Sequence, residues 1–219
     1  MEKQRIKLTN LMKLPYTSLQ NNEKYELLEV LGHTEIVAFV GKYFRKINPV
    51  TLFFWTFNVL IMSFIGYRIG QEVQQKTFVF ENLSTIGFSF LFLFSVGIIL
   101  HENIHYLAYK FLGAKNGSVK YQWRKMIFLA SADKFVANRN EFLFVAILPF
   151  FIINLLAILP MFFVGGAWFY FFGFTLFVHT ALCSGDFALI SFLYEHRKKT
   201  IYTYDDLDEN KSYFYIRIV

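Results

Sequence analysis

The sequence contains a single cysteine, Cys183, so the chain can form no internal disulfide. Charged residues are also few, at 17% of the chain, whereas 55% of it is hydrophobic and the mean hydropathy is +0.39. This balance excludes an ordinary soluble domain, in which about a quarter of the residues are charged. No internal repeat or low-complexity tract is visible. No cleavable signal sequence is visible either, because the first 48 residues are polar and mixed in charge.

Four apolar stretches are each long enough to cross a bilayer. They cover approximately residues 51–70, 83–106, 142–164 and 167–194. The sequence therefore predicts an all-α polytopic membrane protein with four transmembrane helices, an N-terminal amphipathic segment and a small cytoplasmic β element. We divide it into an interfacial region over residues 1–48, a transmembrane core over 49–196 and a cytoplasmic tail over 197–219.

The segment 21–46 precedes the first apolar stretch and carries apolar residues at roughly helical spacing. These residues are Leu27, Leu28, Leu31, Ile36, Val37, Val40 and Phe44. The spacing predicts an amphipathic helix that lies on the membrane surface. A helix packed against a partner fits the same pattern equally well.

The positions of Lys and Arg predict the orientation in the membrane. Basic residues collect between the second and third apolar stretches and again just after the fourth, at Lys110, Lys115, Lys120, Arg124, Lys125, Lys134, Arg139, Arg197, Lys198 and Lys199. We therefore expect both termini and the middle loop to be cytoplasmic. The formal net charge of +6 is then a signal of topology and of contact with anionic lipid. It does not indicate a nucleic-acid partner, since no binding motif accompanies it.

The second apolar stretch is uncharged as far as Leu100 and then presents His101, Glu102 and His105 without a break. An ionisable residue at that depth costs about 3 kcal/mol or more unless it faces protein, water or a partner. The two histidines are four positions apart, so on a helix both rings project from one face and can reach a single ion. Glu102 lies about 100° further around the helix, at the rim of the same site. This is the H-E-x-x-H pattern of zinc metallopeptidases.

A catalytic zinc has three protein ligands and an open position, so a third ligand is needed. Asp186 is the only other carboxylate within a predicted hydrocarbon segment, and it lies in the same half of the membrane as the two histidines. His179 is the second choice of ligand. It also fits a supporting or substrate-facing group, or a satisfied core histidine. Asn154 fits either a hydrogen-bond donor to the substrate or a cap for the gap that Pro149 or Pro160 leaves in its helix.

Three stretches, "HENIHYLAYKFLGAK", "NRNEFLFVAILPF" and "HTALCSGDFALI", resemble the zincin peptidase family of small bacterial membrane proteins. The similarity extends from His101 into the C-terminal tail. It implies a fold related to the site-2 protease class of intramembrane zinc proteases. It further implies that His101, His105 and Asp186 are zinc ligands and that Glu102 is the catalytic acid/base.

One departure from that class lies at the third ligand. Site-2 proteases usually have an Asn-Pro-Asp-Gly type signature there, whereas this chain has Ser184, Gly185, Asp186 and Phe187. The carboxylate is retained, but the residues around it differ. The resemblance therefore supports Asp186 as a zinc ligand more strongly than it supports a shared way of binding substrates.

The segments outside the apolar stretches indicate how a substrate is presented. Residues 117–123 and 125–132 have strand-like composition and predict a hairpin near Arg124, and the alternating tail "SYFYIRIV" predicts a third strand after the turn "DDLDEN". A small sheet beside the zinc either holds an unwound peptide by edge pairing or only covers the loop.

Two functions follow from the sequence. The first is a zinc-dependent intramembrane or membrane-proximal endopeptidase in the bacterial cytoplasmic membrane, acting on membrane proteins or peptides, with its active site toward the cytoplasm. The second is a noncatalytic membrane regulatory or immunity protein with a structural or degenerate metal site. A fourth protein ligand such as His179 would favour the second.

Overall fold

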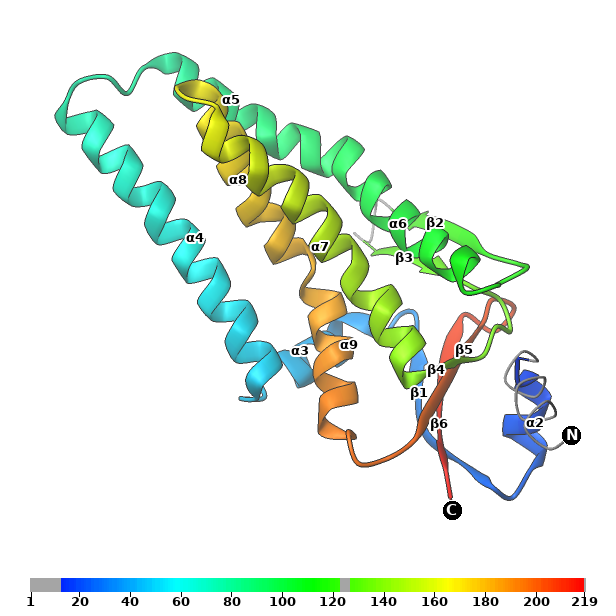
Figure 1. Ribbon diagram of the computed structural model, residues 1–219. Helices are drawn as coiled ribbons and strands as arrows, with labels where there is room; N and C mark the ends of the chain where they lie inside the picture. Colours follow the sequence, from blue (N-terminus) through cyan, green and yellow to red (C-terminus); the bar gives the residue numbers. More distant parts are fainter. Residues whose placement is uncertain (1–12, 123–126, 219) are drawn as a thin grey trace, which may run out of the picture.

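The computed structural model describes residues 13–122 and 127–218; its long helices lie side by side, and its strands gather at one end of them (Figure 1). The elements, in chain order, are α2 (Tyr16–Asn21), β1 (Tyr25–Gly32), α3 (Ile36–Phe44), α4 (Pro49–Gln74), α5 (Phe80–Phe92), η1 (Leu93–Gly97), α6 (Ile98–Phe111), β2 (Ser118–Gln122), β3 (Ile127–Ser131), β4 (Ala137–Asn138), α7 (Arg139–Phe163), α8 (Ala167–Leu182), α9 (Ser184–Glu195), β5 (Ile201–Asp206) and β6 (Lys211–Arg217).

Three helices in the described part of the chain are long and apolar enough to cross a membrane. They are α4, the continuous α5–η1–α6 unit over Phe80–Phe111, and α7. The fourth predicted span is not one helix: α8 and α9 meet at an angle of 46°, so they form a fourth span only if the bent pair crosses together. The described part of the chain is therefore mostly helical, with three or four candidate membrane spans.

The break between α8 and α9 determines where Asp186 lies. Cys183 ends α8, and α9 begins at Ser184, which places Asp186 in the first turn of a new helix. The unpaired N–H groups and the dipole at a helix N-terminus favour a carboxylate in the first turn. The bend thus gives Asp186 a favourable position that an unbroken span would not provide.

The second span is interrupted by a π-helical turn, η1, directly before α6. A π-turn inserts an extra residue, which rotates everything that follows around the helix axis, and such turns are frequent at functional sites. Gly97 closes this turn: a Cβ there would lie only 2.8 Å from Leu93 Cδ2. The turn therefore sets which face of α6 carries His101 and His105, and it favours glycine at its end.

A four-stranded sheet in the order β1-β6-β5-β4 lies at the end of the bundle. β1 pairs antiparallel with β6, with Tyr25 opposite Arg217 and Gly32 opposite Lys211. The prediction of one amphipathic helix over 21–46 is therefore wrong: Tyr25–Gly32 is a strand, and only Ile36–Phe44 is helical. The helical spacing was misleading because β6, far along the chain, offers this segment a strand partner.

The predicted pairing of these two strands is confirmed, since β2 and β3 pair antiparallel from Ser118 opposite Ser131 to Gln122 opposite Ile127. The predicted junction near Arg124 lies outside the described residues. The predicted strand in the tail also exists, as β6, and the turn predicted before it lies at residues 207–210. However, β6 does not extend the hairpin. It belongs to the four-stranded sheet, so the two sheets are separate.

A hydrophobic core fixes the four-stranded sheet against α9. Phe192 on α9, Ile201 on β5 and Phe214 on β6 have no exposed surface, and the rings of Phe192 and Phe214 are 4.9 Å apart between centroids. Burying large aromatic side chains of this kind stabilises a fold by about 2–3 kcal/mol each. The helix that carries Asp186 is thereby held by the sheet.

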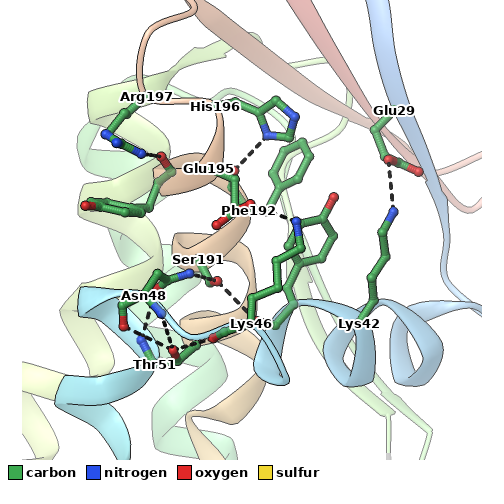
Figure 2. A network of polar contacts seen from close by, with 12 residues as sticks. Glu29, Lys42, Lys46, Asn48, Thr51, Ser191, Phe192, Glu195, His196 and Arg197 are labelled. Atoms are coloured by element: carbon green, nitrogen blue, oxygen red, sulfur yellow. Dashed lines mark hydrogen bonds and ion pairs between the residues drawn. The ribbon is translucent and has the colours of Figure 1, made fainter.

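Polar contacts tie the other side of α9 to the corner between α3 and α4 (Figure 2). Asn48 caps α4 by accepting from the backbone N–H of Val50 and Thr51, and its Nδ2 donates to Ser191 Oγ on α9 at 2.7 Å. Nearby, Lys46 and Glu195 form an ion pair at 2.7 Å. The C-terminal half of α9 is therefore held on two sides.

Candidate metal centre

Two histidines of α6 and one aspartate of α9 converge at a single point in the protein. His101 Nε2 lies 3.1 Å from His105 Nε2. The Asp186 carboxylate faces both rings, with Oδ2 3.2 Å from His101 Nε2 and Oδ1 3.2 Å from His105 Nε2. Sequence positions 101, 105 and 186 thus form one cluster, although they belong to separate helices.

The ring orientation of His105 is set by a backbone carbonyl on α7. His105 Nδ1 lies 2.9 Å from the Val145 carbonyl oxygen, and because that oxygen is an acceptor, Nδ1 carries the proton. In a regular helix the Val145 carbonyl would accept from residue 149, but residue 149 is a proline and has no N–H. Pro149 therefore leaves this acceptor available to His105, whose Nε2 then faces Asp186.

A chain of hydrogen bonds sets the ring of His101 in the same way. Thr180 Oγ1 donates to the Leu176 carbonyl oxygen at 2.8 Å and accepts from Asn154 Nδ2 at 2.9 Å. This leaves Asn154 Oδ1 as the acceptor for His179 Nδ1–H at 2.7 Å. His179 Nε2 is then an acceptor, and it receives the Nδ1–H of His101 at 3.1 Å. The chain ends at His101, whose Nε2 faces Asp186 and has a lone pair when the ring is neutral.

When both rings are neutral, three electron-pair donors therefore face one another. In that form two imidazole nitrogens and a carboxylate at 3.1–3.2 Å repel unless a cation joins them. Nitrogen ligands together with a carboxylate are a common ligand set for catalytic zinc. The donor set therefore fits a divalent cation of this kind, with the N–H groups of both rings fixed by acceptors as in known zinc sites.

A second group, His101, His179 and Cys183, also has donor atoms close enough to share an ion. Cys183 Sγ lies 3.8 Å from His179 Nε2. That nitrogen, however, is already the acceptor for His101 Nδ1–H. An ion at this position would break the hydrogen-bond chain, so the group with Asp186 is the better metal site.

Glu102 lies beside the cluster and is only 7% exposed. Its carboxylate accepts a hydrogen bond from the backbone of Ala130 on β3, which brings the hairpin against the site. Its side chain is also part of the wall of two cavities that meet at the cluster. A buried carboxylate that faces open space next to a metal site is well placed to exchange protons with a bound molecule.

All the residues that the sequence singles out lie at this centre, but one has a different contact from those expected. Asn154 neither caps a proline gap nor lies free for a substrate; it bonds His179 and Thr180. The gap at Pro149 is filled by His105 instead. Sequence reasoning missed Thr180 and the Val145 carbonyl. The signal for Val145 was its position four residues before an intrahelical proline.

The first of the two cavities, of about 140 Å³, extends from Glu102, His105 and Asp186 toward the four-stranded sheet. The second, of about 380 Å³, lies on the side of His101 and His179 and is bounded by α3 through Ile36, Val37 and Val40. Phe128 on β3 lines both. The cluster is therefore reachable from two sides.

Comparison with known proteins points to the same chemistry. Residues 94–201 match the model of a family described as "Putative zincin peptidase". This segment begins in η1, ends at the first residue of β5 and includes His101, Glu102, His105, His179 and Asp186. No curated protein and no solved structure matches the chain. The similarity indicates a zinc-dependent peptidase.

Proposed function

We propose that this protein is a zinc-dependent endopeptidase that hydrolyses peptide bonds of membrane proteins or peptides within or next to the bilayer. His101, His105 and Asp186 are the zinc ligands, and Glu102 is the catalytic acid/base. The similarity to zincin peptidases supports the class of reaction. The placement of the cluster on helices that can cross a membrane supports the location.

The observation that carries the proposal is the direction of the hydrogen bonds. The Val145 carbonyl and the His179 ring each engage Nδ1 of one histidine, so both Nε2 atoms are left to face the Asp186 carboxylate. With neutral rings, this arrangement gains stability when a metal cation binds between the three groups.

A zinc ion at this site would supply Lewis-acid activation of water and of the substrate carbonyl. The chain supplies the remaining functions. Glu102 takes a proton from the attacking water on its carboxylate and delivers it to the leaving amine nitrogen. Buried surroundings limit access of bulk water to this carboxylate, so the proton moves between defined partners.

The relationship to the site-2 protease class remains part of the proposal. The bent α8–α9 pair supports it, since the break places the third ligand at the start of a helix within the bundle. The β2–β3 hairpin, whose Ala130 contacts Glu102, is suited to align an extended peptide by main-chain pairing. We further propose that the hairpin and the four-stranded sheet face the cytoplasm, which is the orientation that the positions of Lys and Arg predict.

The alternative is a noncatalytic regulatory or immunity protein with a structural metal. A structural zinc site has four protein ligands. His179 is the nearest candidate for the fourth, but it uses its two ring nitrogens to contact His101 and Asn154. The three residues that would hold the metal therefore lie beside Glu102 without a fourth ligand from His179, which favours the peptidase.

The test is metal content and turnover of two variants in detergent. Glu102→Gln keeps the shape of the side chain and all three ligands, so zinc content should persist while turnover falls by about 10²-fold or more. Asp186→Ala removes a ligand, so both zinc and turnover should be lost. Unchanged turnover in Glu102→Gln, measured against membrane-protein and peptide substrates, would contradict the peptidase; full zinc retention in Asp186→Ala would contradict the ligand set.

A further inference from the structure

The first cavity is lined by a carboxylate, Asp205, in addition to Glu102 and Asp186 at the metal centre. Its walls are largely apolar and include Leu31, Phe39 and Phe142. Glu102, His105 and Asp186 line it from the metal centre, and Asp205 and Ser212 line it from the β5–β6 hairpin. Asp205 lies outside the helices and has no part in the proposed metal site or acid/base chemistry.

Asp205 is held in place by groups that bind a carboxylate. Ser212 Oγ donates to its Oδ1 at 2.6 Å, and the Ala132 backbone donates a further hydrogen bond. An ionised carboxylate has about four acceptor positions, so these two bonds leave capacity for another donor. Within the described part of the chain no ion pair to Asp205 is present; the nearby Lys134 side chain pairs instead with Asp208 at 2.8 Å.

The path between the metal centre and Asp205 suits a long side chain. Tyr109 lines the cavity and lies one helical turn after His105 on α6, which is about 6 Å along the helix axis. The Tyr109 hydroxyl is close enough to both Asp186 and Asp205 for both charges to act on it. A side chain that extends from the metal centre to Asp205 therefore passes Tyr109 and the apolar wall of the cavity.

The second cavity has a different lining. Apart from the residues of the metal centre itself, it is bounded by apolar or small side chains such as Ile36, Ile98 and Leu182. The two sides of the site therefore differ: one ends in apolar surface and the other ends in a fixed carboxylate. A peptide that spans the site meets both environments.

We infer that the cavity ending at Asp205 is a side-chain pocket that selects Lys or Arg next to the scissile bond. The apolar wall packs against the methylene stem, and the Asp205 carboxylate accepts hydrogen bonds from the charged head group. This assignment rests on the proposed peptidase function for its position next to a scissile bond. Recognition of the cation itself rests only on the cavity.

Membrane substrates commonly have this chemistry. Transmembrane helices are apolar and end at the cytoplasmic interface in Lys or Arg. An apolar residue of such a helix matches the second cavity, and the basic residue that follows matches the pocket at Asp205. The pocket would thus position cleavage at the cytoplasmic boundary of an apolar segment.

The experiment measures peptide binding to the full chain in detergent, using the Glu102→Gln variant so that no probe is consumed. Three fluorescent peptides have the same apolar sequence and differ at one scanned position, which is Lys, acetyl-lysine or norleucine. We expect the Lys peptide to bind at least about tenfold more tightly than either neutral peptide at one position. Equal binding of the three at every position would overturn the pocket without the need for any variant of Asp205.

A second set of variants locates the effect. Asp205→Asn removes the charge and should abolish the preference for Lys, whereas Asp208→Asn, at an exposed carboxylate of the same hairpin, should leave it intact. Loss of the preference in both would overturn the assignment to Asp205. Cleavage of the same peptides by the unmodified chain separates the two proposals: a Lys preference in binding with no cleavage contradicts the peptidase alone, and cleavage without a Lys preference contradicts the pocket alone.

Discussion

His105 donates its Nδ1–H to the Val145 carbonyl oxygen at 2.9 Å, and that carbonyl is available because Pro149 has no N–H to offer it. The proline ring also clashes with this oxygen, so α7 cannot form its regular hydrogen bond at that position. A residue that would otherwise weaken α7 thus creates the acceptor that orients one of the two metal-binding rings. The proline and the histidine act together although they lie on different helices.

Replacing this proline should weaken the metal site. In Pro149→Ala a new N–H competes for the Val145 carbonyl, so His105 loses part of its orienting bond and zinc affinity should fall by about tenfold. Competition with a chelator measures this. Pro160→Ala is the matched control, because it also restores a helical N–H in α7 but does so away from the centre. Equal zinc affinities in the two variants would contradict the role of Pro149.

The site could be predicted from sequence to the extent that it depends on local spacing. His101, Glu102 and His105 lie within one helical turn, so their relative positions follow from helix geometry alone. Asp186 could be found because a carboxylate in an apolar stretch is costly and needs a partner. The hydrogen-bond chain through Thr180 could not, since it depends on how α7 and α8 face each other.

The fold also has parts that follow from local sequence pattern and parts that depend on contacts between distant segments. Long apolar helices and the β2–β3 hairpin are set by local pattern and were predicted. The strand Tyr25–Gly32 was not, because its partner β6 is almost the whole chain away and its apolar spacing also suits a helix. The break at Cys183 was missed for another reason: no proline marks it, and the first turn of α9 reads as a continuation of α8.

The amide of Asn154 should matter for zinc binding through His179. Asn154→Ala removes the acceptor of His179 Nδ1–H, which releases the ring that fixes His101, and zinc affinity should fall by about tenfold or more. Asn154→Asp keeps an acceptor oxygen and should bind zinc more tightly than the alanine variant. Asn58→Ala removes another buried span amide, on α4, and serves as the control. If Asn154→Ala and Asn58→Ala bound zinc equally, the hydrogen-bond chain would have no effect on the metal.

The π-turn before α6 should tolerate no side chain at Gly97. In Gly97→Ala the new Cβ meets Leu93 Cδ2 at 2.8 Å, and Leu93 is fully buried, so the turn must shift at a cost of about 1–3 kcal/mol. Because the turn sets the face of α6, zinc affinity should fall as well. Gly87→Ala on α5 meets nothing within 4 Å and should be neutral or slightly stabilising. Thermal unfolding and zinc titration of the two variants distinguish a special turn from a general need for glycine.

The pocket carboxylate should give the protein a specific pH dependence. Burial, together with the nearby charge of Asp133, raises the pKa of Asp205 to about 6 from its ordinary 3.8, although bonds from Ser212 and the Ala132 backbone act in the other direction. Because the folded pKa is the higher one, ionisation of Asp205 costs no stability below about pH 4, and the full cost is present above about pH 6.

Asp205→Asn cannot ionise, so its Tm relative to the unmodified chain should rise between pH 4 and pH 7. The upper limit of the effect is about 3 kcal/mol, reduced by the partial exposure of the carboxyl group. Asp208→Asn, at a largely exposed carboxylate of the same hairpin, is the control. A flat difference for Asp205→Asn would show that its carboxyl group is ionised without cost.

The orientation in the membrane can be tested with two single cysteines. Gln74 ends α4 at one end of the bundle, and Asn116 lies just before β2 at the other end (Figure 1). Both are exposed, whereas the native Cys183 has no exposed surface and should not react. Asn116 is preferred to Gly117, where a Cβ would lie 3.0 Å from the Tyr106 ring.

In intact cells a membrane-impermeant thiol reagent should label Gln74→Cys and leave Asn116→Cys unlabelled until the membrane is opened, because Lys and Arg concentrate on the side of Asn116. The reverse pattern would place the metal centre, the hairpin and the Asp205 pocket on the outer side and would remove the match to the basic cytoplasmic ends of substrate helices. Labelling of both positions from outside would contradict a membrane-spanning α5–η1–α6 unit, which is the span that lies between them.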